Sequence, residues 1–242
     1  MGSIITLIIV LVGVVALIII LLFYHKKGKN DEGNLTHTHY HIVNQNDNRY
    51  DDFNKSEQEL AGMEGEAFVK EALEDYLSFH GGYLFNNFCF KDDNGYSSEI
   101  DHILITKSGV FVIETKAIRG TIYGKEDDEF WSNVKEPALT VKTFRNPIKQ
   151  NIGHINHLKK TIKDNAPKMQ SIIIFLDADI SHIDSPYVFD ISSAIEYIRN
   201  FESINKHGDE YVERVYKQIK AVQDKYGITN EEHLDNIRSK YN

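Results

Sequence analysis

The sequence predicts an α/β domain with a mixed central sheet, preceded by a membrane-spanning helix and followed by extra helices. The order of elements expected between residues 57 and 180 is helix, three strands, helix and strand, which is typical of the α/β class. The apolar run QSIIIFLD at 170–177 is typical of a central strand covered on both faces. Residues 4–23 carry no charge and predict the membrane span.

The first segment matches the thickness of a bilayer. At about 1.5 Å of rise per residue, its twenty residues cover the roughly 30 Å hydrocarbon core. A cleaved signal peptide is the alternative, but no Lys or Arg precedes the run, and LLFYHKKGK stands where a cleavage site would follow. Lys26, Lys27 and Lys29 come directly after the run, and positive flanks stay in the cytoplasm. We expect a single-pass cell-membrane protein with its N-terminus outside and its folded domain in the cytoplasm.

Residues 24–56 have the composition of a linker. They are polar and show neither a helical nor a strand period. His37, His39 and His41 alternate within this segment and suit either a transition-metal site or, as we expect, solvated side chains. The single cysteine, Cys89, excludes an internal disulfide and suits a small buried thiol in a strand. The predicted domains are the folded unit at 57–180 and a helical extension at 181–242 packed on it.

The first helix of the folded unit is expected over residues 56–80. Ser56 and Glu59 form a capping-box pattern, and Gly81-Gly82 supplies the stop. Val69, Leu73, Tyr76 and Leu77 share one face at helical spacing. Glu66 extends this face toward the N-terminus, so it is the acidic residue of the helix that is expected to point inward.

Strands and helices alternate after this helix. Strands are expected at about 83–90, 99–106, 109–117 and 120–124, followed by an irregular segment in which Trp131 is a packing residue. Asn146-Pro147 predicts the start of a helix, with Asn as N-cap and Pro in the first turn. A short strand and a helix are expected within 185–198, and Thr229 with Glu232 caps a last short helix.

The helix expected over 208–227 carries an apolar stripe, which packs on its own domain or forms a homodimer interface. The residues of this stripe are Val212, Val215, Tyr216, Ile219 and Val222.

The hairpin IDHILITKSGVFVIETK at 100–116 carries charged groups in an otherwise apolar context. A two-residue turn at Lys107-Ser108 would pair residues whose numbers sum to 215, which places Asp101 opposite Glu114. Cross-strand Cβ atoms lie about 4.5–5.5 Å apart, and two carboxylates at that distance repel unless a proton or cation lies between them. Mg²⁺ is commonly bound by one or two carboxylates, and Lys116 projects to the same face as Glu114. A surface cluster held together by Lys116 is the alternative.

Four elements of the sequence, taken together and in this order, resemble the nuclease-related domain (NERD) family. They are GMEGE at 62–66, the hairpin region 99–124, the lone Trp131 and NPIKQNIGHINHL at 146–158. This family is similar to the PD-(D/E)xK phosphodiesterases. The resemblance, over roughly residues 60–176, implies a restriction-endonuclease-like αβββαβ core and a nuclease that hydrolyses nucleic-acid phosphodiester bonds with Mg²⁺ or Mn²⁺.

The resemblance also implies the site residues. Asp101, Glu114 and Lys116 match the core D…(D/E)xK pattern, and Glu66 matches the helix carboxylate that often completes the metal site. The implied metal ligands are therefore Asp101, Glu114 and Glu66. Gln150 matches a glutamine on the following helix. Ile100 stands where the superfamily usually has proline.

The charge distribution keeps a second function open. The net charge of −9 disfavours a nucleic-acid binder that works by bulk electrostatics. Residues 135–168 are nevertheless basic, and they suggest a local face for DNA, RNA or a protein. The alternative to the nuclease is thus a catalytically inactive, membrane-tethered module that binds nucleic acid or protein through this face. The basic residues are Lys135, Lys142, Arg145, Lys149, Lys159, Lys160, Lys163 and Lys168.

Overall fold

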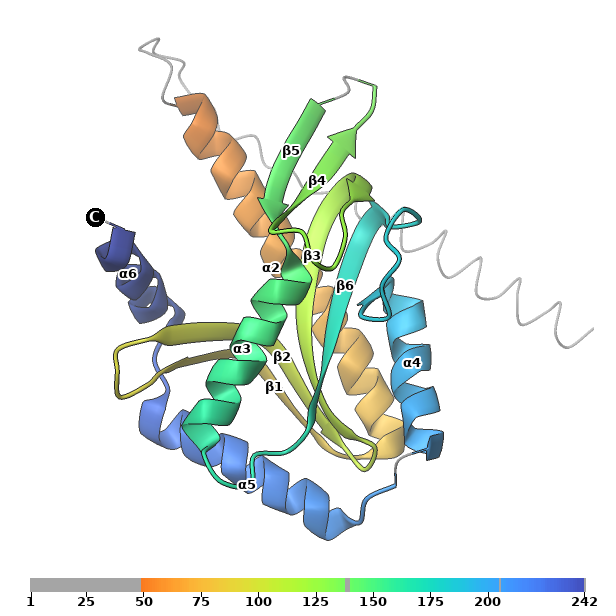
Figure 1. The fold of residues 1–242 in the computed structure, drawn as a ribbon, viewed down its shortest axis with the longest axis vertical. Coiled ribbons are helices and arrows are strands. Elements are labelled where there is room, and N and C mark those ends of the chain that lie inside the picture. Colours follow the sequence, from red (N-terminus) through yellow and green to blue (C-terminus); the bar gives the residue numbers. More distant parts are fainter. Residues whose placement is uncertain (1–48, 138–139, 205, 242) are drawn as a thin grey trace, which may run out of the picture. The chain divides into compact units, whose positions relative to one another are not determined.

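The structure, a computed structural model, describes residues 49–137, 140–204 and 206–241 (Figure 1). These residues form an α/β fold with five helices and seven strands, in an order that confirms the predicted class. The elements are α2 (Arg49–His80), β1 (Tyr83–Lys91), β2 (Ser97–Thr106), β3 (Gly109–Tyr123), β4 (Phe130–Lys135), β5 (Thr140–Arg145), α3 (Pro147–Ile162), β6 (Met169–Asp179), β7 (Val188–Phe189), α4 (Ile191–Ile204), α5 (Asp209–Tyr226) and α6 (Asn230–Tyr241).

The predicted membrane span and the three alternating histidines lie outside the described residues. Within the described ranges, no helix combines the length and the apolar composition needed to cross a bilayer. The anchor at residues 4–23 therefore stays a prediction.

The sheet is mostly antiparallel and is organised around β3. Strands β1 to β5 follow one another as antiparallel neighbours, while β6 pairs in parallel with β3 and β7 pairs in parallel with β6. Because β6 occupies one edge of β3, strands β2 and β4 share the other edge. β2 pairs with residues 109–113 of β3 and β4 with residues 121–123. Residues 114–120 of β3 thus have no strand partner on that edge, and the sheet has a gap there.

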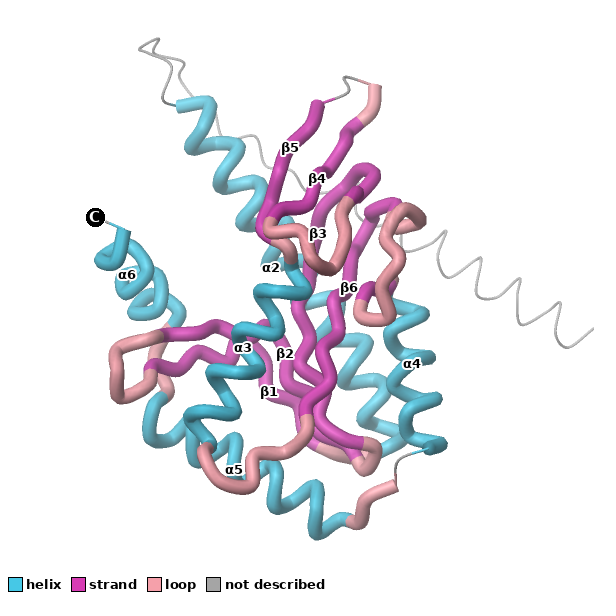
Figure 2. The backbone as a smooth tube through the Cα atoms, in the orientation of Figure 1, coloured by secondary structure: helices cyan, strands magenta, loops and turns pink. Residues whose placement is uncertain are grey.

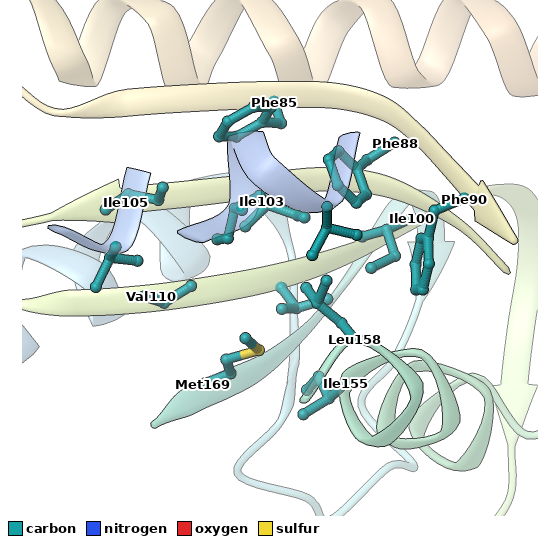
Figure 3. Packing of buried hydrophobic residues seen from close by; sticks show 14 of the residues in the cluster. Phe85, Phe88, Phe90, Ile100, Ile103, Ile105, Val110, Ile155, Leu158 and Met169 are labelled. Carbon is teal, nitrogen blue, oxygen red and sulfur yellow. The ribbon is translucent and has the colours of Figure 1, made fainter. Parts of the chain in front are cut away.

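Helices cover both faces of the sheet, as Figure 2 shows. Alternate residues of β3 point to opposite faces, so Val110 and Val112 belong to one apolar cluster and Phe111 and Ile113 to another. The first cluster lies under α3 and α5, and Figure 3 shows Ile155 and Leu158 of α3 against the strands. The second cluster lies under α2 and α4.

The segment predicted to be irregular is a β-hairpin, so that prediction is wrong. β4 and β5 pair from Phe130↔Arg145 to Lys135↔Thr140. β4 buries Trp131 and Asn133, whereas β5 is largely exposed, which hides the two-residue period in the sequence. Trp131 is fully buried and donates a hydrogen bond from Nε1 to the Lys125 carbonyl, which confirms its packing role.

The predicted helix start at Ser56 is also wrong. α2 begins at Arg49, so Ser56 and Glu59 lie inside the helix and the last residues of the predicted linker belong to α2. This stretch is polar in sequence, which is also the composition of a linker, and that explains the error. The stop is confirmed, because Gly81 and Gly82 take φ values of 71° and 128°.

The C-terminal elements follow the predictions. Thr229 and Glu232 cap α6 reciprocally, since each backbone N–H of the pair is bonded to the side chain of the other. The apolar stripe of α5 is buried in the core of the domain, with Val215 and Ile219 fully enclosed. The stripe therefore offers no exposed dimer face, and a homodimer stays a prediction without a surface to support it.

Candidate active site

Asp101 lies where β2 leaves its neighbours. The predicted register is confirmed from Thr106↔Gly109 to His102↔Ile113, where paired numbers sum to 215, but the ladder ends one residue before Asp101 and Glu114. The ladder with β1 also skips Asp101, because Asn87 opposite it takes a φ of 48°. The Asp101 carboxylate instead accepts a hydrogen bond at 2.7 Å from the backbone N–H of Thr115. This carboxylate therefore pairs with a backbone N–H on the uncovered edge of β3, at the start of the gap.

Glu114, Lys116 and Gln150 form one hydrogen-bonded group at this gap. Glu114 is buried, and its Oε1 accepts from Lys116 Nζ at 2.5 Å and from Gln150 Nε2 at 2.7 Å. Lys116 Nζ also donates to Gln150 Oε1 at 3.3 Å. The alternation of β3 places Glu114 and Lys116 on the α3 face. The structure thus brings three of the predicted site residues into direct contact.

The first turn of α3 is fixed by Asn146, which places Gln150. The Asn146 side chain accepts from the N–H of Ile148 as an N-cap and donates to the carbonyls of Lys125, Glu126 and Asp128. Asn146 is fully buried, so these bonds tie the helix start to the loop before β4. Gln150 therefore has a defined position rather than a flexible surface one.

His154 belongs to the site and was missed in the sequence. Its Nε2 lies 3.9 Å from Glu114 Oε2, and this buried nitrogen has no hydrogen-bond partner among the described residues. Burial lowers the pKa of His154, against the opposing effect of the Glu114 charge, so the ring is neutral at neutral pH. The available signal was its spacing: His154 follows Gln150 by one helical turn on the same face.

Glu66 approaches the gap from the opposite side of the sheet. It lies on α2, and its neighbour Gly65 packs against β3, where an added Cβ would lie 2.8 Å from the Ala117 Cβ. This contact explains the second glycine of GMEGE, because only glycine lets the helix approach so closely. Burial raises the pKa of Glu66, the charge of Glu114 raises it further, and Lys116 lowers it. Burial also raises the pKa of Asp101 well above its ordinary value, and the charges of Glu114 and Glu66 raise it further. The hydrogen bond from Thr115 and the charge of Lys116 lower it.

The donor chemistry of these carboxylates fits a hard divalent cation. The charge of Glu114 raises the pKa of both Glu66 and Asp101, and the ammonium group of Lys116 contacts Glu114. Among the described residues, however, no three Asp, Glu, His or Cys side chains are spaced as a ready-made metal-ligand set. Asp101 and Glu114 alone match the one or two carboxylates with which proteins commonly hold Mg²⁺. The ligand set of Glu66, Asp101 and Glu114 stays a prediction.

A groove of about 1010 Å³ adjoins the site. One wall is α2, and the other consists of the end of β3 and the β4–β5 hairpin. Lys116 belongs to both the groove and the hydrogen-bonded group. Arg119, Lys135 and Lys142 add positive charge to the strand wall.

The basic residues at 135–168 do not form one face. Lys135, Lys142, Arg145 and Lys149 lie on the hairpin and the first turn of α3, and the remaining four lie near the C-terminal end of α3 and the start of β6. Lys149 and Lys159, the nearest members of the two groups along α3, are ten residues or about 15 Å apart. The basic residues therefore form two groups rather than a single face, and only the hairpin group is near the site.

Comparisons with known proteins agree with this geometry. Residues 61–176 match the family model of the nuclease-related domain. An uncharacterized protein of Bacillus anthracis is 35% identical over 106 residues, which are 44% of this chain and 49% of that protein. The chain thus spans about half the length of this relative. None of the solved structures matches the chain.

The nuclease-related domain family is of the PD-(D/E)xK phosphodiesterase superfamily, and the contact of Lys116 with Glu114 agrees with the pattern of that superfamily. Within that superfamily, residues 61–176 are a nuclease-related domain, as the sequence resemblance implied. β7 and helices α4 to α6 lie beyond the matched residues, although α4 and α5 complete its two apolar clusters.

Proposed function

We propose that this chain is a membrane-anchored, metal-dependent nuclease with a restriction-endonuclease-like core, which hydrolyses nucleic-acid phosphodiester bonds. The contact of Lys116, Glu114 and Gln150 at the open edge of β3, beside Asp101, carries this proposal. A gap in a sheet edge gives a phosphate access to side chains that are carried by strands. Strands position such side chains more precisely than loops do.

Each residue has a role that follows from its contacts. Asp101 and Glu114, supported by Glu66, would hold Mg²⁺ or Mn²⁺, which when bound stabilises negative charge on the phosphate and lowers the pKa of water. Lys116 orients the attacking water and stabilises the charge that develops on phosphate oxygens. Gln150 keeps the carboxylate and the ammonium group in place by bonding to both. Water attacks phosphorus, the bond to the leaving oxygen breaks, and that oxygen takes up a proton.

The test is cleavage of labelled DNA and RNA by the purified full chain, with Mg²⁺, with Mn²⁺ and with a chelator. We expect cleavage only with a divalent cation and a loss of at least 100-fold in Lys116→Ala and Glu114→Gln, since single charge-stabilising groups contribute about 10²–10³ in rate. Lys107→Ala is the matched control, because this lysine lies at the other end of the same hairpin and pairs with Asp209. Full activity of both site variants would refute the assignment.

A second candidate, a non-catalytic module that binds nucleic acid, is favoured by one observation. Lys116 and Gln150 both donate a hydrogen bond to Glu114 Oε1, so this carboxylate oxygen has its partners within the protein. On this hypothesis the same assay shows binding that weakens steeply with salt but no cleavage under any metal condition. Binding that persists at high salt would indicate a protein partner instead.

The membrane anchor is part of the proposal and has its own test. It is supported by the uncharged run at residues 4–23 and the three lysines that follow it. We expect the chain in the membrane fraction of cells, with a tag at residue 1 accessible to external protease and a tag at residue 242 protected. Recovery of the full chain in the soluble fraction would contradict it.

A further inference from the structure

The groove beside Lys116 has two chemically different walls. The strand wall carries Arg119, Lys135 and Lys142 in addition to Lys116. Arg119 pairs with Asp177 at 3.6 Å, but neither Lys135 nor Lys142 makes an ion pair within the described part of the chain. By contrast, the neighbouring Arg145 and Lys149 are both paired with Glu129 outside the groove. Lys135 and Lys142 are thus the groove cations left available to an anionic ligand.

The helical wall combines small residues, an aromatic ring and two carboxylates. Ala61, Gly62, Gly65 and Phe68 of α2 line the groove, together with Glu57 and Glu64. Phe68 is 53% exposed although it lines a cavity. An exposed aromatic ring and cations in one groove are the composition of surfaces that bind single-stranded nucleic acid, where bases stack on the ring and phosphates contact the cations.

The two glycines of GMEGE have different surroundings. Gly65 is pressed against Ala117, whereas a Cβ built on Gly62 meets no atom within 4 Å. Glycine destabilises a helix interior by about 0.5–1 kcal/mol relative to alanine, and at Gly62 no close packing within the described chain requires it. Its small size keeps the groove open at this point.

From these observations we propose that the groove binds single-stranded DNA or RNA, with phosphates along Lys135, Lys142 and Lys116 and a base stacked on Phe68. The inference names the substrate class of the proposed nuclease and therefore rests on that function. A duplex presents its phosphates outward and keeps its bases paired in the interior, so it cannot use the cations and the ring together. A single strand exposes both at once.

The test measures binding of the full chain to a fluorescent single-stranded 12-mer of mixed sequence, and to the duplex of the same sequence, in a chelator. We expect at least tenfold tighter binding of the single strand. Phe68→Ala weakens it about 5- to 50-fold, in the range found for loss of one stacking contact. Phe79→Ala is the matched control, because this phenylalanine is on the same helix and 86% exposed but lies outside the groove.

A second pair of variants tests whether binding needs the open part of the groove beside Gly62. Gly62→Trp fills the groove and is expected to reduce single-strand affinity at least tenfold, whereas Gly153→Trp, at another helical glycine with no atom within 4 Å, leaves it unchanged. Both variants raise helix propensity, so neither substitution is expected to disrupt its helix. Lys142→Ala lowers the slope of log affinity against log salt by about 0.7.

The outcomes separate this inference from the proposed function. Equal or tighter binding of duplex, or normal affinity in both Phe68→Ala and Gly62→Trp, overturns the single-strand assignment even if the chain cleaves nucleic acid. Single-strand binding with the expected losses supports the assignment even if no condition yields cleavage. If Gly62→Trp fails to fold, Phe68→Ala decides alone, since it changes an exposed side chain.

Discussion

Asp101→Asn is expected to stabilise the protein at neutral pH while abolishing its proposed activity. The amide oxygen still accepts the hydrogen bond from Thr115 N–H, so the backbone contact is retained. What the variant removes is a buried carboxylate whose pKa is raised by burial and by the charge of Glu114. Active sites commonly hold such unfavourable groups, and their removal stabilises the fold at the expense of function.

The size of the effect follows from two opposing charges. Two carboxylates about 5 Å apart repel by roughly 3 kcal/mol at an effective dielectric constant of 20. At Asp101 the charge of Glu114 has the larger effect and the opposing charge of Lys116 the smaller one, so the repulsion is only partly offset. The desolvation of Asp101 remains, and we expect a net gain of about 1 kcal/mol at pH 7. For a domain of this size that gain corresponds to an increase in Tm of about 2–4 °C.

The direction of the Asp101 pKa shift determines how the stability difference between wild type and variant changes with pH. Because the folded-state pKa of Asp101 is raised, the folded state binds the proton more tightly, and the wild type loses stability relative to the variant as pH rises above the ordinary value of 3.8. The advantage of Asp101→Asn should thus grow between pH 5 and pH 8. Asp190→Asn is the control of opposite sign. Hydrogen bonds from Ser193 lower the pKa of Asp190, so its contribution is present at neutral pH and lost as pH falls.

The assay is urea unfolding of the full chain in mild detergent, followed by fluorescence. Trp131 is the single tryptophan and is fully buried, so it reports loss of the core directly. An Asp101→Asn variant that is less stable than the wild type at pH 8 by 1 kcal/mol or more would refute the reasoning. It would show that the native fold favours the ionised carboxylate.

Three further predictions concern the supports of the site. Asn146→Ala should lower the free energy of unfolding by about 2–4 kcal/mol in urea, because it removes an N-cap and leaves buried carbonyls without a donor; a loss under 1 kcal/mol would contradict this. Gly65→Ala should destabilise the protein by about 1–3 kcal/mol, because its new Cβ meets Ala117. Gly62→Ala should be neutral or stabilising by up to about 1 kcal/mol. Thermal melts that rank the two variants in reverse would refute the difference between their surroundings. Val215→Ala should lower the free energy of unfolding in urea by about 1–3 kcal/mol without a change in sedimentation, since this side chain is enclosed in its own domain. A changed oligomeric state would instead support a dimer interface on α5.

Local patterns predicted the site residues better than the sheet around them. The two-residue turn fixed the register of the β2–β3 hairpin, and this register determined which residues face each other. What the pattern did not reveal is that β2 leaves β3 at Asp101. That departure depends on Asn87 in β1 and on β4, which pairs with the same edge of β3 from seven residues after Glu114. Both are long-range effects that no local period encodes.

The errors share a physical origin in solvent exposure. β5 has few buried side chains and the first turns of α2 are polar in sequence, so neither carries a clear apolar period. His154 escaped notice for the opposite reason. A histidine inside an amphipathic helix has no distinguishing pattern, and its role depends on Glu114 Oε2, forty residues away in the sequence.

The gap in the sheet explains why this site has an excess of negative charge. On either side of the gap the same edge of β3 pairs with β2 or β4, but at Thr115 a carboxylate supplies the acceptor. Asp101 in that position stands beside Glu114, and the close contact of Gly65 with Ala117 brings Glu66 toward the same place. A structural role alone would be served by asparagine at 101, which makes the same bond without the repulsion. A divalent cation, as proposed above, would compensate Asp101, Glu114 and Glu66 together, and the stability of Asp101→Asn measures how much the carboxylate at position 101 costs the protein without it.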